Sequence, residues 1–138
     1  MIALDTNTLV RMLIEDNEKQ ALTVKKLIES VEKKGQHIII LSEVLIETVW
    51  VLESVYECTR EDIYRFLETL MHTSIFIFSE PQVMGNAIHH FKKGGDFADL
   101  VIVIQALNHH ARKFFSFDKK LQKTFPDYVV KKLGPNDL

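Results

Sequence analysis

The chain has 138 residues and a formal net charge of −2, with 46% hydrophobic and 26% charged residues. This length suits a single domain over residues 1–138 with a real apolar core, and the composition excludes a disordered chain. No apolar run approaches the roughly 18 residues of a membrane span, and the first residues do not form a secretory signal. With Cys58 as its single cysteine, the chain has no internal disulfide and fits the reducing cytoplasm.

Short apolar runs alternate with amphipathic segments in the first half of the chain. Apolar residues at helical spacing mark helices, while short, wholly apolar runs mark buried strands. In chain order we predict a buried strand at 2–4, helices at 6–14 and 18–34, a buried strand at 38–41, a helix from 42 to about 56, a helix that begins at 59 or 60, and a strand at 75–78. Gly35 is placed to end the second helix, and Ser42 is placed to cap the third.

The second half continues the alternation. We predict a helix from Pro81 to about 92, a loop at 93–96, a helix at 97–110, a strand at 113–117, a short helix at 119–123 and a strand at 128–130. The segment 97–110 contains β-branched residues, but its length of about 14 residues favours a helix. Strands alternating with helices predict a mainly parallel sheet covered by helices on both faces, an α/β fold.

Four acidic residues stand where strands give way to helices: Asp5, Glu43, Asp99 and Asp118. The strand ends that feed helices line one edge of an open α/β sheet, so these carboxylates are predicted to converge there. Two carboxylates about 4 Å apart repel by roughly 4 kcal/mol at an effective dielectric near 20. Such a group needs a cation, and carboxylates prefer hard divalent ions such as Mg²⁺ and Mn²⁺.

Each acid also has a structural explanation. Asp5 and Asp118 suit helix N-caps, and Asp96 and Asp99 have the spacing of a capping pair. Glu43 lies in the first turn of a helix, where the helix dipole stabilises a negative charge. Four such acids together are harder to explain as independent caps, and we expect Asp96 to be the cap and Asp99 the ligand. Asn7 and Thr8 are candidates to hold Asp5 by hydrogen bonds, and Glu47 lies one turn after Glu43 with its role open.

Competing chemistries lack their residues. The adjacent pairs His89-His90 and His109-His110 diverge on a helix and cannot chelate as pairs, and Gly94-Gly95 forms no phosphate-binding motif. No serine or cysteine nucleophile has a matching histidine and acid. The residues therefore favour metal-dependent chemistry on phosphate esters.

With these motifs in this order, the chain resembles PIN-domain ribonucleases, most closely the VapC-type toxins of prokaryotic toxin–antitoxin pairs. The matching motifs are Leu4-Asp5-Thr6-Asn7, Ser42-Glu43, Asp96-Phe97-Ala98-Asp99 and Ser116-Phe117-Asp118-Lys119-Lys120-Leu121. The resemblance implies a three-layer α/β/α sandwich with a central, mainly parallel five-stranded sheet.

The resemblance also implies a function and partners. Asp5, Glu43, Asp99 and Asp118 would bind Mg²⁺, or Mn²⁺ in its place, and the metal would activate water to cleave RNA. Asn7, Asp96 and Ser116 would support that site. A homodimer and an antitoxin that covers the active-site groove are also implied. Arg11 matches a basic position of one branch of the family, with a plain surface charge as the alternative.

Two other functions stay open from the residues. A haloacid-dehalogenase-like phosphatase would need a second acid two residues after Asp5, where Asn7 stands. A Mg²⁺-binding signalling or scaffold module without nuclease activity would use the same acids. Between Arg112 and Lys132 seven cations face only Asp118 and Asp127, and this stretch suits either an RNA backbone or an ordinary solvated surface.

Overall fold

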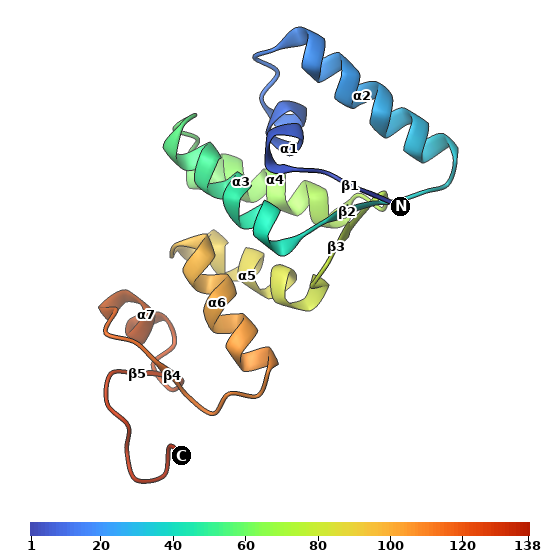
Figure 1. The fold of residues 1–138 in the computed structure, drawn as a ribbon. Helices are drawn as coiled ribbons and strands as arrows, with labels where there is room; N and C mark the ends of the chain where they lie inside the picture. The colour runs from blue at the N-terminus through green and yellow to red at the C-terminus, as the bar shows by residue number, and fades with distance from the viewer.

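The computed structural model describes residues 1–138, in which short strands alternate with helices (Figure 1). The strands are β1 (Ile2–Ala3), β2 (Ile38–Ile40), β3 (Phe76–Phe78), β4 (Phe114–Phe115) and β5 (Val129–Val130). The helices are α1 (Thr6–Leu13), α2 (Glu18–Lys33), α3 (Ser42–Ser54), α4 (Arg60–His72), α5 (Pro81–Lys93), α6 (Phe97–Asn108) and α7 (Lys119–Thr124). Every predicted element is present, including the helix over the β-branched stretch. None of the helices combines the length and apolarity that a bilayer crossing requires.

Local signals explain where several helices begin and end. The Asn17 side chain accepts a hydrogen bond from the Gln20 backbone N–H and starts α2. Gly35 follows that helix at a φ of 61°, a left-handed conformation that suits glycine. Pro81 is the first residue of α5, where its missing N–H costs nothing. The prediction for Ser42 was wrong: Leu41 is the capping residue of α3, and it makes no side-chain cap bond.

The five strands form two sheets rather than one. β1, β2 and β3 make a parallel sheet in that order, with Ile2 opposite Ile38 and Ile38 opposite Phe76. β4 and β5 make a separate parallel pair. The mixed α/β architecture is therefore confirmed, while the single central five-stranded sheet is not.

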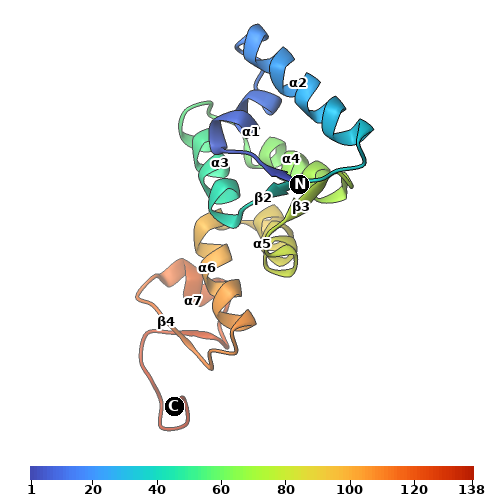
Figure 2. The same ribbon diagram turned by 45° about the vertical axis from the view of Figure 1, so that its right-hand side comes forward.

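The position of α6 explains the division. This helix packs along α5, and near its end the Gln105 amide donates hydrogen bonds to both carboxylate oxygens of Glu80, at 3.3 and 3.1 Å. The chain then leaves α6 on the side of the molecule remote from β1, and β4, α7 and β5 form a separate lobe there (Figures 1 and 2). We call this lobe, residues 114–130, the C-terminal unit.

A continuous apolar core joins the three-stranded sheet to the helices. It contains strand residues such as Ile38 and Ile40 and helix residues such as Leu67, Phe91 and Phe97, all less than a few per cent exposed. The prediction that the first strand is buried was wrong, because Ile2 is 38% exposed and Ala3 is also exposed. The cause is that β1 lies at the edge of the sheet and has a neighbour on only one side.

Candidate active site

Asp5 caps α1 directly after β1. Its Oδ1 accepts hydrogen bonds from the Thr8 backbone N–H at 2.8 Å and from the Thr8 hydroxyl at 2.7 Å. These bonds, the hydroxyl bond first, lower the pKa of Asp5 below its ordinary value. Thr8 is thus confirmed as a residue that holds Asp5, whereas Asn7 makes no hydrogen bond to it and only lines the same cavity of about 420 Å³. An ionised, fixed carboxylate at this position is suited to a cation.

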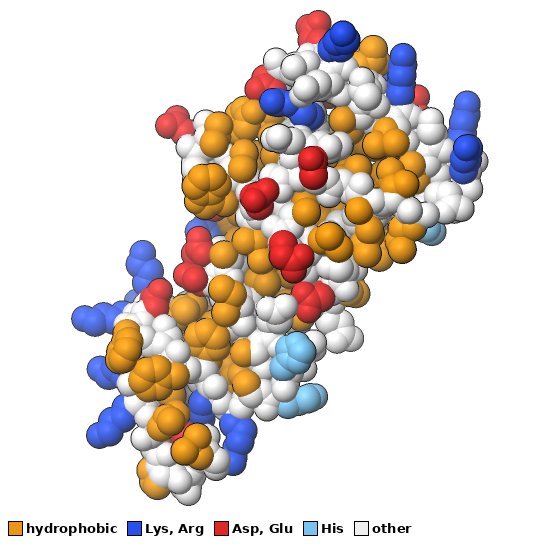
Figure 3. Space-filling model, viewed as in Figure 1, with side chains coloured by type: hydrophobic (Ala, Val, Ile, Leu, Met, Phe, Trp, Pro, Cys, Tyr) orange, Lys and Arg blue, Asp and Glu red, His pale blue; other side chains and the backbone are white.

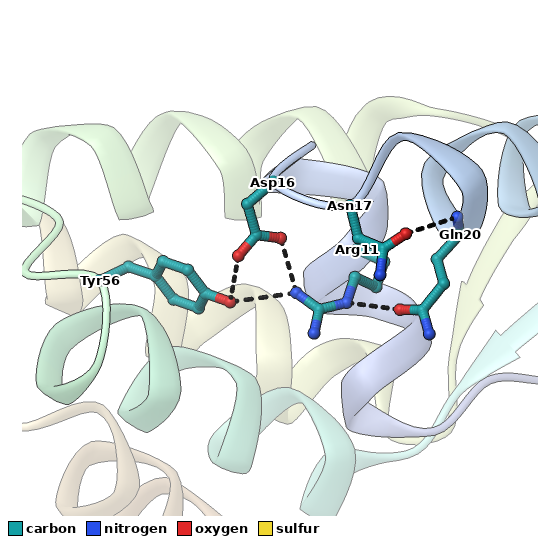
Figure 4. A network of polar contacts seen from close by, with 5 residues as sticks. All are labelled: Arg11, Asp16, Asn17, Gln20 and Tyr56. Carbon is teal, nitrogen blue, oxygen red and sulfur yellow. Dashed lines mark hydrogen bonds and ion pairs between the residues drawn. The ribbon is translucent and has the colours of Figure 1, made fainter.

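Arg11 ties the Asp5 helix to its surroundings (Figure 4). Its guanidinium donates to the Gln20 side chain at 2.7 Å, to Asp16 at 2.6 Å and to the Tyr56 hydroxyl at 3.1 Å. Tyr56 in turn donates to Asp16 at 3.1 Å. This network joins α1 to the start of α2 and to the segment after α3, so Arg11 has a positioning role beyond a plain surface charge.

Glu43 is exposed in the first turn of α3, directly after β2, and Glu47 is exposed one turn later. The neighbouring Ser42 is buried, and its hydroxyl donates to Glu80 at 2.9 Å and contacts the Ser79 hydroxyl at 3.2 Å. Ser42 therefore joins the carboxyl ends of β2 and β3. Glu43 remains free to face solvent or a ligand.

Glu80 is a half-buried acid that the sequence prediction overlooked. It follows β3 just as Asp5 follows β1 and Glu43 follows β2, so the same signal was present. Its carboxylate is occupied by Ser42 and Gln105, which makes it a link between α3, α5 and α6. We therefore assign it a structural role.

Asp96, Asp99 and Asp118 line one cavity of about 390 Å³ between α6 and α7, together with Arg60 and Lys120. Asp96 caps α6 through the Asp99 backbone N–H at 3.0 Å, which confirms its predicted role. Burial raises the pKa of Asp99, and repulsion from Asp96 and Asp118 raises it further. Mutual repulsion of this kind is what a bound cation relieves.

Asp118 caps α7 and accepts hydrogen bonds from the backbone N–H groups of Lys120 at 2.8 Å and Leu121 at 3.2 Å. The Ser116 hydroxyl accepts a bond from the Asp118 backbone N–H at 3.0 Å. Ser116 thus shapes the turn that carries Asp118.

A third cavity, of about 440 Å³, runs along α3 and is lined by Glu43, Glu47, Trp50, Glu53 and Asp96. Burial raises the pKa of Glu53, repulsion from Asp96 adds to the effect, and Arg60 opposes it. This groove connects the Glu43 end of the molecule with the Asp96 end. Figure 3 shows acidic side chains across this middle region and Lys and Arg side chains around the C-terminal unit.

The four predicted acids do not meet within one chain. Asp5 lines the cavity of about 420 Å³, Glu43 lines the one of about 440 Å³, and Asp99 and Asp118 line the one of about 390 Å³. No group of three acidic, histidine or cysteine side chains is placed to hold a metal ion. The donors are the hard oxygens that Mg²⁺ prefers, but their arrangement in the isolated chain does not fit a metal centre.

Comparison with known proteins identifies the family. The model of the PIN domain matches residues 2–125, nearly the whole chain. The chain belongs to the PIN-domain family. This PIN domain is also 31% identical over 124 residues to a protein named "VapC ribonuclease" from Aquifex aeolicus (strain VF5), with 89% of this chain and 91% of the relative covered. No solved structure matches it.

Proposed function

We propose that this PIN domain is an endoribonuclease that cleaves RNA phosphodiester bonds and is the toxin of a type II toxin–antitoxin pair. The observation that supports the proposal best is the acidic group around Asp99, whose pKa is raised by burial and by two neighbouring carboxylates. Such a group favours a divalent cation. The similarity over 89% of the chain to a relative named as a VapC ribonuclease supports the reaction.

The proposed site consists of Asp5, Glu43, Asp99 and Asp118, with Asp96 and Ser116 in support. Asn7 keeps a place as a lining residue beside Asp5. We assign Mg²⁺ as the metal, with Mn²⁺ as a substitute, because all donors are carboxylates. When bound, such an ion supplies a water that ionises near neutral pH. The site is complete only when Asp5 and Glu43 lie beside Asp99 and Asp118, from the same chain or from a second copy.

The C-terminal unit has the charge that an RNA substrate requires. Lys119, Lys120 and Lys123 lie on α7, and Lys120 lines the cavity that contains Asp118. Cations near the acids attract the phosphate backbone and offset its repulsion by the carboxylates. The proposal also includes an antitoxin protein that covers the active-site groove, a homodimer and action in the cytoplasm.

The two other functions considered from the sequence have no support. The matched family is the PIN domain rather than a phosphatase family, and Asn7 stands where the phosphatases need their second acid. A signalling or scaffold module is likewise not favoured by any observed feature.

An RNA cleavage assay tests the proposed function. Purified protein is incubated with structured RNA and Mg²⁺, beside an Asp5→Asn variant, a sample with chelator and an Asp127→Asn variant as the matched control. Asn is also a good helix cap, so Asp5→Asn keeps α1 intact while it removes the charge. We expect cleavage by the wild type and Asp127→Asn only. Equal cleavage in all samples would refute the proposal.

A further inference from the structure

Four strands of this chain, β1, β3, β4 and β5, each have one unpaired edge. β1 pairs only with β2, and β4 pairs only with β5. Both β1 and β4 carry exposed apolar side chains: Ile2 on β1 is 38% exposed and Phe115 on β4 is 51% exposed. Phe117, just beyond β4, is 79% exposed. Free edges of parallel strands with apolar side chains readily accept another strand.

β4 is held away from β1 of its own chain. The residues Phe97, Leu100, Val101, Val103 and Ile104 form the buried face of α6. With the Gln105–Glu80 hydrogen bonds, this face fixes α6 on α5. Only residues 109–113 join α6 to β4, and five residues span at most about 18 Å. The C-terminal unit lies at the end of the molecule opposite β1 (Figures 1 and 2). Pairing within the chain would require α6 to leave α5 and expose its apolar face.

The two parts of the molecule have opposite charge. Residues 1–108 contain sixteen Asp and Glu but ten Lys and Arg, whereas residues 109–138 contain three Asp and seven Lys and Arg. The basic side chains surround the C-terminal unit, and the acidic ones lie across the middle of the molecule (Figure 3). Attraction therefore favours the C-terminal unit of one copy against the acidic part of another. A reciprocal exchange of this kind closes as a two-fold dimer.

We infer that β1 of one chain pairs in parallel with β4 of a second chain. The result is a sheet with the order β3-β2-β1-β4-β5, in which the last two strands come from the partner. All existing pairs are parallel, so the new pair continues the sheet without a change of direction. The free edges of β1 and β4 are thereby paired, and β3 and β5 form the outer edges of the joined sheet.

The exchange also joins the divided acids. Asp5 comes two residues after β1, and Asp118 three residues after β4. In a parallel sheet the carboxyl ends of neighbouring strands lie side by side. Asp5 and Glu43 of one chain would therefore face Asp118 of the partner subunit. This part of the inference rests on the proposed function, whereas the strand pairing does not.

Disulfide trapping tests the strand pairing. In a Cys58→Ala background, Ile2→Cys and Phe115→Cys are made as two separate proteins, each with a single cysteine, and the two are mixed and oxidised. A second mixture, with Ala3→Cys in place of Ile2→Cys, tests the alternative register. Disulfide formation requires Cα atoms within about 7 Å. We expect a covalent heterodimer on a non-reducing gel. Ile77→Cys mixed with Phe115→Cys is the control, because Ile77 on β3 is equally exposed, at 39%.

The double variant Ile2→Cys/Phe115→Cys in the same background measures pairing within the chain. A disulfide-closed monomer, with no heterodimer in the mixed sample, would overturn the inference, as would the absence of any disulfide in either register. Size-exclusion chromatography with light scattering of the unmodified protein should show a dimer. A monomer at micromolar concentration would also overturn it.

Complementation tests the shared site. Asp5→Asn and Asp118→Asn are each expected to be inactive, but their mixture should contain heterodimers with one intact site. With random assortment, the mixture should recover about one quarter of wild-type RNA cleavage. Active wild type without recovery would overturn the shared site. Trapped heterodimers with an inactive wild type would instead show that the pairing holds and the nuclease function fails.

Discussion

Thr8 binds one oxygen of Asp5 twice, through its backbone N–H at 2.8 Å and its hydroxyl at 2.7 Å. Since these bonds are stronger to the ionised carboxylate than to the neutral acid, they lower the pKa of Asp5 in the folded state. A lowered pKa contributes stability above the unfolded-state pKa, and this stability is lost as pH falls through the folded-state pKa. The pair therefore couples helix capping to the charge of the proposed site.

Replacing Thr8 with Val should raise the pKa of Asp5 and lower the stability by about 1 kcal/mol, because the hydroxyl bond is lost while the side-chain shape is kept. The pKa is measured by NMR titration of the carboxyl, and stability by urea unfolding at neutral pH. Thr23→Val is the control, since the Thr23 hydroxyl donates to the Lys19 carbonyl at 3.0 Å and does not touch Asp5. An unchanged Asp5 pKa in Thr8→Val would contradict the assignment.

Asp99→Asn should stabilise the metal-free protein at neutral pH. The raised pKa of Asp99 means that its charged form is disfavoured in the folded state. Its contribution to stability is complete below the unfolded-state pKa and is lost as pH rises through the folded-state pKa. With solvent screening, the gain at pH 7 should be on the order of 0.5 kcal/mol and should vanish in acid. Thermal melts at several pH values measure it, and a loss of stability at pH 7 would show that the repulsion is not significant.

Tyr56→Phe should destabilise the protein by about 1–3 kcal/mol. The change removes the hydroxyl that accepts from Arg11 and donates to Asp16, and bonds to charged groups are the stronger kind. Tyr64→Phe is a matched control, because the Tyr64 hydroxyl makes an exposed bond only to Glu68 of the same helix, at 2.6 Å. Urea midpoints compare the two variants. Equal shifts would mean that the Arg11 network does not stabilise the junction of α1, α2 and the segment after α3.

Divalent cations should stabilise the folded protein through the acids. At a hundredfold excess over the dissociation constant, a bound ion adds about 2.7 kcal/mol. Thermal melts with Mg²⁺, Mn²⁺ and chelator measure this gain. It should disappear in Asp118→Asn and persist in Asp127→Asn. A gain of the same size in both variants would place the bound ion elsewhere.

The local structure of this PIN domain could be predicted from its sequence because the signals are short in range. Apolar spacing, Asn17, Gly35 and Pro81 determine where helices begin and end within a few residues. The arrangement of the strands could not be predicted. β1 and β4 have only two residues each, and whether they belong to one sheet or to two depends on how α6 packs. That packing is a property of the whole fold.

The candidate site shows the same limit. Asp5, Asp96 and Asp118 all cap helices, so both the structural and the chemical explanation apply to them. Which carboxylates lie near one another depends on tertiary structure, and the sequence predicted one group where the chain has separate cavities. Glu80 was overlooked because no motif contains it, although it follows a strand as the other acids do.

The fixation of α6 on α5 has a consequence for how such an enzyme responds to its own abundance. If each site needs two molecules, catalysis at great dilution rises with the square of the enzyme concentration rather than in proportion to it. A few newly made copies would then be almost harmless, and damage would begin only after a threshold is crossed. Specific activity measured over a dilution series would reveal this nonlinearity directly.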